Sequence, residues 1–285
     1  MAEPNGDPAN LQQLRADIDR IDNALHDLLM ERAAVVRRIA QVKGGGPIFR
    51  PGREASVIRR LVARHAGPLP VRALVSVWRE VIGAFTAVQG RNAVAVLAPD
   101  SGSPYAALAR DHFGASLPLL PCRSVGQVMN AVMAGEAAVG VLPVPREEDP
   151  DPWWRTITGT GKDTPRIVGR LPFAGGEAHG DRTEAALVAK LQPEPTGDDA
   201  TYLALEVSAT VSRGRIVGKL QESGLAPEFF ATWETRGSDF HLLLIEVGDF
   251  IAADDARLAK LSYQGSPFAW ARPIGSYPRP LNLGP

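Results

Sequence analysis

An arginine interrupts an otherwise apolar repeat near the start of the sequence. Positions 11, 14, 18, 21, 25, 28, 32, 35, 39 and 42 are spaced alternately by three and four, and all except Arg32 are Leu, Ile or Val. A guanidinium in such a stripe is costly unless it is paired, so one interpretation is a buried ion pair or a side chain that reaches out to water. The other is that Arg32 faces a polar pocket and binds an anion, because its planar fork matches a carboxylate.

Two more cations lie beside this repeat at equivalent heptad positions. Arg15 follows Leu14, and Lys43 follows Val42. On one helix they would lie about 42 Å apart, so they cannot serve one site within one chain. In an antiparallel dimer, however, Arg15 of one protomer would approach Arg32 and Lys43 of the other. Taken singly, each of the two is better explained as a solvated surface charge.

The same spacing predicts the element that carries these cations. A heptad repeat from residue 11 to residue 42 is typical of a long helix that packs against a partner helix, and this one would be about 50 Å long. The sequence Gly44-Gly45-Gly46-Pro47 ends it. We expect a second helix over residues 52–65, with Arg53 and Glu54 in its first turn, and a third over residues 70–89.

These elements carry ordered motifs that resemble a known family. The segments LRADIDRIDNALHDLLMERAAVVRRIAQVK, RPGREASVI and VWREVIGAFTAVQ follow one another between residues 11 and 89, and they resemble the all-helical chorismate mutase family. The resemblance implies an intertwined helical homodimer that converts chorismate to prephenate without a cofactor or a metal. In such a reaction the protein holds the substrate in a reactive conformer and stabilises charge at the breaking ether bond.

The resemblance also implies roles for the cations, because chorismate carries two carboxylates. Arg15 matches the arginine that reaches into the partner's site and binds one carboxylate. Arg32 matches the arginine that binds the other within its own subunit, in agreement with its place in the apolar repeat. Lys43 matches the lysine that contacts a carboxylate and the ether oxygen.

Three further site residues follow from the resemblance, with two departures. Arg53 matches an arginine that organises the pocket, Glu54 the glutamate that binds the substrate hydroxyl, and Gln89 the glutamine or glutamate that hydrogen-bonds the ether oxygen. Arg50 stands where the family usually has an acid, and Phe85 where a small polar residue is common. Arg50 could reverse a local charge, and Phe85 could narrow the pocket or simply pack.

Residues 91–191 alternate between short strands and helices, which predicts a small α/β domain with a parallel sheet. We expect strands over residues 93–98, 117–120 and 138–142, and helices over residues 103–113 and 124–134. The segments APDSGSPYAALARDHFG and SVGQVMNAVMAGEAAVGVLPV resemble the catalytic domain of prephenate dehydratase.

That second resemblance ends where dehydratase chemistry would require it. Pro145-Arg146-Glu147 replaces the Glu-Asn-Ser that follows the strand in that family, and Thr183-Glu184-Ala185 lacks the arginine of Thr-Arg-Phe. The segment between the two is too short for the second lobe. We therefore expect a degenerate domain that is structural or senses a ligand.

The sequence after the cluster of Pro, Gly and Asp residues at 192–199, which is typical of a linker, resembles an ACT-like α+β domain over residues 200–277. We expect strands over residues 202–207 and 240–247 and a helix over residues 216–223, with an irregular tail from Pro273. Glu234-Thr235-Arg236-Gly237 faintly resembles an effector-binding Glu-Ser-Arg-Pro motif. This predicts an aromatic amino acid as a regulatory ligand, although ordinary α+β packing explains the pattern equally well.

Composition excludes several other classes of protein. The formal net charge of −1 argues against a nucleic-acid binder. A single cysteine, Cys122, allows no intramolecular disulfide and no cysteine-cluster metal site, and the five histidines show no metal-ligand spacing. No apolar stretch is long enough for a transmembrane helix, and residues 1–10 do not resemble a signal peptide. We therefore expect a cytoplasmic protein.

The predicted fold is multidomain: an all-helical mutase module over residues 8–90, a degenerate dehydratase-like α/β domain over 91–191 and an ACT-like domain over 200–277. The predicted function is that of a chorismate mutase in aromatic amino-acid biosynthesis. Two alternatives remain open. One is a bifunctional chorismate mutase–prephenate dehydratase, and the other is a non-catalytic regulatory partner that keeps the mutase fold.

Overall fold

Three helices precede a mixed α/β region, as the sequence predicts. The computed structural model describes residues 8–43, 48–90, 92–175, 183–234, 237–261 and 266–283. The helices are α1 (Pro8–Lys43), α2 (Pro51–Arg64) and α3 (Val71–Val88). Their ends lie within a few residues of the predicted ones, because the glycines that follow Lys43 in the sequence and the prolines at residues 51 and 70 favour helix ends locally.

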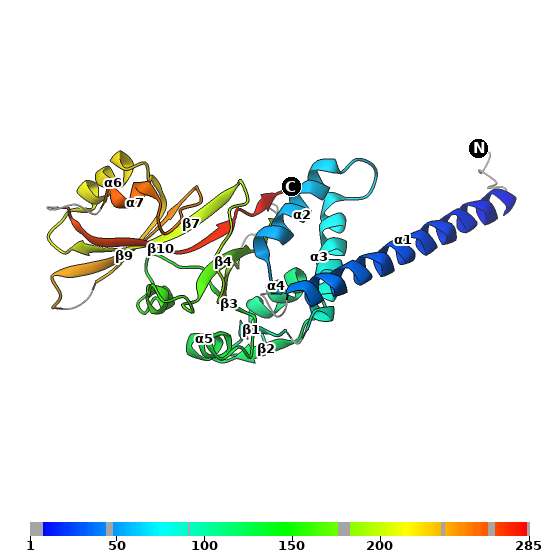
Figure 1. Ribbon diagram of the computed structural model, residues 1–285, viewed down its shortest axis with the longest axis horizontal. Coiled ribbons are helices and arrows are strands. Elements are labelled where there is room, and N and C mark those ends of the chain that lie inside the picture. Colours follow the sequence, from blue (N-terminus) through cyan, green and yellow to red (C-terminus); the bar gives the residue numbers. More distant parts are fainter. Residues whose placement is uncertain are drawn as a thin grey trace, which may run out of the picture.

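Helix α1 projects away from the rest of the chain (Figure 1). Its apolar seam, the Leu, Ile and Val residues at the repeat positions 11–42, is exposed along its whole length, with Leu25 at 53% and Leu28 at 61% exposure. Isolated helices gain little stability from propensity alone, and an apolar stripe on a stable helix is normally packed against another surface. The seam therefore lacks its packing partner within the described part of the chain.

The next segment forms the α/β unit that the sequence predicts. Strands β1 (Val94–Leu97), β2 (Leu119–Cys122) and β3 (Val139–Pro143) are parallel, with β1 in the middle, and are joined by α4 (Pro104–Phe113) and α5 (Val125–Ala134). Ser124 caps α5 by accepting a hydrogen bond from the backbone N–H of Gln127. On its other side β3 pairs with an antiparallel strand, so the sheet as a whole is mixed.

One nine-stranded sheet includes both the middle and the C-terminal part of the chain. Its order is β2-β1-β3-β6-β4-β10-β7-β9-β8. The added strands are β4 (Arg166–Leu171), β6 (Ala185–Ala189), β7 (Asp199–Ser208), β8 (Pro227–Trp233), β9 (Phe240–Val247) and β10 (Phe268–Pro278). The predicted boundary between residues 191 and 200 therefore falls within a continuous sheet.

The C-terminal strands have a recognisable topology. With α6 (Arg213–Glu222) and α7 (Ala256–Ala259), the strands β7, β8, β9 and β10 follow a β-α-β-β-α-β order and pair as β10-β7-β9-β8. This is the ferredoxin-like arrangement. The two strands and the helix predicted for this region are present as β7, β9 and α6.

The prediction of an irregular tail from Pro273 is wrong. Strand β10 continues to Pro278, and β11 (Leu281–Asn282) pairs with β5 (Ala174–Gly175) in a separate two-stranded sheet. Proline lacks the N–H that a central strand normally donates, which is why the composition suggested irregular backbone. In β10 the register with β7 shifts between Pro273 and Gly275, and this irregularity accommodates the proline.

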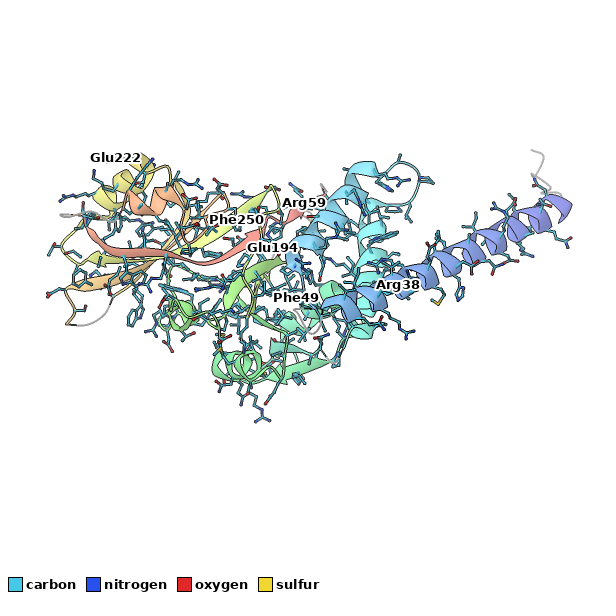
Figure 2. All side chains as sticks on the ribbon, viewed as in Figure 1. Arg38, Phe49, Arg59, Glu194, Glu222 and Phe250 are labelled. Carbon is cyan, nitrogen blue, oxygen red and sulfur yellow. The ribbon has the colours of Figure 1, made fainter. Side chains whose placement is uncertain are left out.

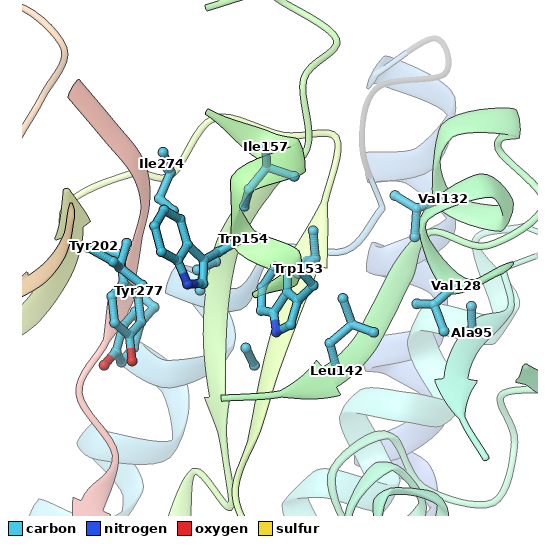
Figure 3. Packing of buried hydrophobic residues seen from close by; sticks show 14 of the residues in the cluster. Ala95, Val128, Val132, Leu142, Trp153, Trp154, Ile157, Tyr202, Ile274 and Tyr277 are labelled. Atoms are coloured by element: carbon cyan, nitrogen blue, oxygen red, sulfur yellow. The ribbon is translucent and has the colours of Figure 1, made fainter. Parts of the chain in front are cut away.

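Aromatic side chains fill the core on one face of the sheet. Trp153 and Trp154, from the 3-10 turn η1 (Trp153–Ile157), belong to this core: Trp154 lies toward Ile274, Tyr202 and Tyr277, and Trp153 lies toward Leu142 (Figure 3). On the opposite face of the C-terminal strands, α6 and α7 cover a second core that includes Leu203, Leu220 and Leu258. The C-terminal part of the sheet thus has a buried core on each face.

Contacts from both α2 and α3 attach the helical module to the rest of the chain. On α3, a Cβ added at Gly83 would lie 2.0 Å from the carbonyl oxygen of Phe113, so only glycine allows α3 to cross α4 this closely. On α2, the Arg59 guanidinium donates to Thr196 Oγ1 at 2.8 Å and to the carbonyl oxygen of Arg279 at 2.9 Å. Figure 2 shows Arg59 and Glu194 where α2 meets the sheet. The segment predicted as a linker is therefore packed against α2.

Candidate functional site

Arg32 lies where α1 meets α3, and its guanidinium is incompletely paired. Its guanidinium carbon lies 4.2 Å from the centre of the Phe85 ring on α3, a distance typical of a cation–π contact. Its buried Nη1 atom has no hydrogen-bond partner among the described residues. Burial and then the nearby charge of Arg53 lower the pKa of Arg32. A buried donor without an acceptor is costly, so this atom is suited to an anion.

Two further predicted site residues, Arg53 and Gln89, are linked to Arg32 indirectly. Arg53 is exposed in the first turn of α2 and acts electrostatically on Arg32. Gln89 is at the C-terminal end of α3, one turn after Phe85, and its Nε2 donates to the Phe85 carbonyl oxygen at 3.1 Å. Phe85 thus contacts Arg32 through its ring and Gln89 through its carbonyl oxygen, while Arg53 acts on Arg32 through its charge.

Glu54 turns from α2 toward α3, where it pairs with a residue that the sequence analysis missed. Arg79 Nη1 donates to Glu54 Oε2 at 3.2 Å, and the side chains are 5% and 12% exposed. Burial raises the pKa of Glu54 to about 7, although the charge of Arg79 acts in the opposite direction. Burial likewise lowers the pKa of Arg79 to about 10. Both shifts have the sign that desolvation imposes on a buried ion pair.

A signal for Arg79 was present in the sequence. Positions 75, 79, 82 and 86 are spaced as one face of a helix, and Val75 and Thr86 on that face are buried. Arg79 therefore interrupts a buried helix face in the same way as Arg32 interrupts the seam. Only the partner, Glu54 on a different helix, was not predictable from this pattern.

The structure does not bring Arg15 to the other residues. Arg15 is exposed on α1, about 25 Å along the helix axis from Arg32 at 1.5 Å per residue. Lys43 is the last residue of α1, and its side chain lies outside the described residues. If Arg15 takes part in the site, it must therefore come from a different copy of the chain than Arg32.

The two departures from the family pattern have local explanations. Arg50 forms a forked ion pair with Glu194, with Nη2 at 2.9 and 3.1 Å from the two carboxylate oxygens. This pairing neutralises the charge that Arg50 introduces and anchors it to the segment after β6. Phe85 packs under the guanidinium of Arg32 and so positions it.

Glu184, which stands where the motif Thr-Arg-Phe has its arginine, belongs to a polar network. Glu184 accepts from Arg170 Nη2 at 2.8 Å, and Arg170 also contacts Glu246 at 3.4 Å. The Tyr277 hydroxyl donates to Glu246, and its ring stacks on that of Tyr202 with the ring centres 5.8 Å apart. These contacts tie β4 and β6 to β9 and β10. Of the motif at residues 234–237, Thr235 and Arg236 lie outside the described residues.

Within the described ranges, no helix is long and apolar enough to cross a membrane. The same ranges contain no cluster of three or more His, Cys, Asp or Glu side chains that could hold a metal ion.

Solved structures that partly superpose on this chain include a quorum quenching acylase, GqqA, and the prephenate dehydratase of Streptococcus mutans. Both give a TM-score of 0.49, with 20% and 16% sequence identity, over 66% and 65% of this chain and 96% and 97% of theirs. TM-scores below 0.5 do not establish a shared fold.

Curated relatives give a stronger similarity. The bifunctional chorismate mutase/prephenate dehydratase of Pseudomonas aeruginosa is 34% identical over 145 residues, which is 48% of this chain and 40% of the relative. The enzyme of the same name from Aquifex aeolicus is 34% identical over 140 residues, or 47% and 38%. The chain thus spans less than half the length of these relatives.

A family model identifies the helical part of the chain. Residues 14–90 match the model described as chorismate mutase type II. The similarity to the bifunctional relatives covers a larger share of the chain than these residues, so it includes sequence outside the three helices. This agrees with the expected fusion of a mutase module to a further region, and residues 14–90 are similar to the chorismate mutase type II family.

Proposed function

We propose that this protein is a chorismate mutase that converts chorismate to prephenate. The observation that carries the proposal is the guanidinium of Arg32, which lies beside Arg53 with a buried donor lacking an acceptor, in the segment that matches the mutase family. A dianionic substrate supplies the carboxylate oxygens that such a site lacks.

The reaction requires little covalent chemistry from the protein. The ether C–O bond of chorismate breaks as a new C–C bond forms within the same molecule. Nothing is oxidised, reduced or transferred to another molecule, so the reaction needs no cofactor. Arg32 binds one carboxylate, and Lys43 binds a carboxylate and the ether oxygen. Gln89 donates to that oxygen, and Glu54 accepts from the substrate hydroxyl. Holding the reactive conformer and stabilising the developing charge are the main contributions expected.

The proposal includes an intertwined homodimer. The exposed seam of α1 is an apolar surface of the kind that marks a protein interface. A second copy packed along it in the antiparallel sense brings Arg15 toward the Arg32 of its partner. This supplies the cation that one chain cannot place in its own site.

The C-terminal region is proposed as a regulatory, ACT-like domain, and an aromatic amino acid as its ligand. The β-α-β-β-α-β topology of β7 to β10 supports this assignment. The domain division at residues 90, 191 and 200 and the cytoplasmic location remain predictions from the sequence.

A direct assay tests the proposed activity. The purified protein is mixed with chorismate, substrate loss is followed, and the product is identified by chromatography. Prephenate is expected, with the activity absent in the Arg32→Ala variant. Phenylpyruvate formed without acid treatment would instead establish the bifunctional alternative. Chorismate loss no faster than the uncatalysed rate would overturn the proposal and leave the non-catalytic regulatory partner.

A further inference from the structure

Arg79 borders a second cavity on the side of α3 that packs toward α4. This cavity has a volume of about 460 Å³ and lies between α3, α4 and β5. Residues 72, 75, 76, 79 and 80, which share one face of α3, form one wall. Its volume lies within the roughly 300–1,000 Å³ typical of small-molecule sites.

The guanidinium of Arg79 is buried but only partly paired. It is 4% exposed, and its one hydrogen bond within the described ranges is the donation from Nη1 to Glu54. Arginine has five N–H donors in a planar fork, so this one hydrogen bond leaves donors that can bind a further acceptor. A carboxylate in the cavity would supply such an acceptor.

The other charged residues of the lining are Arg72, Glu80, Arg110 and Asp111. Arg72 is exposed and already has a partner. The Glu80 carboxylate is engaged by the backbone N–H of Ala115 at 3.0 Å. The Arg110 guanidinium donates to the carbonyl oxygens of Gly114, Ala115 and Leu117. Asp111, also in the lining, is exposed. Burial and then the charge of Arg79 lower the pKa of His112 well below its ordinary value, so its imidazole is neutral.

The rest of the lining is apolar and partly aromatic. The Phe173 ring lies 4.9 Å from the guanidinium carbon of Arg79, and Val75, Leu108 and Leu283 add aliphatic surface. Such a lining buries a hydrocarbon or aromatic group beside the cation. The ligand that fits this lining is therefore a small molecule with an apolar body and a single carboxylate.

We propose that the cavity between α3, α4 and β5 binds a small apolar monocarboxylate through Arg79. This binding inhibits the mutase because it weakens the ion pair between Arg79 and Glu54. The inference rests on the proposed function, because it assigns Glu54 to the mutase site. A ligand carboxylate competes with Glu54 for the guanidinium of Arg79. It also places a second negative charge near Glu54. Both effects disfavour the ionised Glu54 that the substrate hydroxyl needs.

Calorimetry with 3-phenylpropionate tests binding independently of catalysis. The acid is expected to bind, whereas its uncharged amide is not. Ser76 is exposed on the cavity face of α3, so Ser76→Trp fills the cavity without disturbing a buried position and should abolish binding. Ser101→Trp, at an exposed position in the turn before α4, should bind as the wild type does. Equal binding by Ser76→Trp, or no binding by the wild type, would overturn the proposed site.

Two further measurements locate the effect. Arg32→Ala should still bind 3-phenylpropionate, and loss of binding there would assign the ligand to the mutase site instead. In mutase assays the acid should raise KM for chorismate several-fold in the wild type and Ser101→Trp, and leave KM unchanged in Ser76→Trp. If the wild type binds the acid but has no mutase activity, the proposed function fails while the cavity stands. Inhibition that persists in Ser76→Trp would refute the coupling.

Discussion

The guanidinium carbon of Arg32 lies 4.2 Å from the centre of the Phe85 ring, so a cation on α1 rests on an aromatic face of α3. Arg32 Nη1 is buried without an acceptor in the described structure. Phe85 therefore orients the side chain that is proposed to bind a substrate carboxylate, and the family departure at residue 85 is compatible with activity.

Replacing Arg32 by Ala should reduce kcat/KM for chorismate by at least a hundredfold, since a charge-assisted hydrogen bond and its positioning are lost together. Arg38→Ala is the matched control, because Arg38 is exposed on the same helix. Steady-state assays on both variants check the prediction. Similar losses in the two would mean that α1 charge in general, and not Arg32, supports activity.

Mixing inactive variants should restore activity if each site combines two chains. Arg15→Ala and Arg32→Ala should each be inactive alone. After unfolding and refolding together at equal amounts, random pairing gives mixed dimers with one complete site, and about a quarter of wild-type activity returns. Separately refolded and then assayed proteins are the control. Activity that never exceeds that of the single variants would argue against shared sites.

A charge placed in the seam should dissociate the dimer. Leu25 is an exposed seam residue of α1, whereas Asn23 is exposed between two seam positions. Leu25→Asp should shift the protein to monomers in analytical ultracentrifugation, because an unpaired buried carboxylate is costly at an apolar interface. Asn23→Asp should remain dimeric. A wild-type protein that sediments as a monomer would remove the basis of this prediction.

The pH dependence of the mutase should reflect Glu54. Burial raises its pKa to about 7, so ionised Glu54 increases as pH rises through that value, and kcat/KM should rise with it. Glu54→Gln should lose this acid limb together with part of the activity. Glu80→Gln, at an exposed acid on α3, should keep the limb. A wild-type profile that is flat between pH 5 and pH 8 would contradict the assignment.

The same group links folding to pH. Because the folded-state pKa of Glu54 lies above its ordinary value of 4.5, its protonation favours the folded protein. This contribution is fully present below about pH 4.5 and is lost as pH rises through about 7. Denaturant unfolding of wild type and Glu54→Gln over this range should show the loss in the wild type alone.

Two glycine substitutions in helices should have opposite effects on stability. Gly83→Ala forces α3 away from α4, because the new Cβ would lie 2.0 Å from Phe113 O, and should lower the free energy of unfolding by about 1–3 kcal/mol. At Gly218 in α6 nothing lies within 4 Å of an added Cβ, so Gly218→Ala should raise it by up to about 1 kcal/mol. Urea unfolding measures both.

The sequence by itself determined the helical module and the residues that mark its site. Heptad spacing is a local pattern, and glycine and proline terminate helices locally, so α1, α2 and α3 were predictable nearly to the residue. Arg32 was identifiable because a cation in an apolar repeat is anomalous in any context. The strands β1, β2 and β3 were predictable for the same reason, since short apolar runs separated by helices indicate parallel pairing.

Only the tertiary structure decided which side chains meet across elements. The pairing of Glu54 with Arg79, of Arg50 with Glu194 and of Arg170 with Glu184 joins residues whose separation in sequence carries no local signal. The strands β4, β8 and β10 were missed because their prolines, glycines and charges weaken the alternating pattern, whereas hydrogen bonds to neighbouring strands stabilise them in the sheet. Packing between distant segments, which depends on the whole fold, therefore placed the cavity beside Arg79.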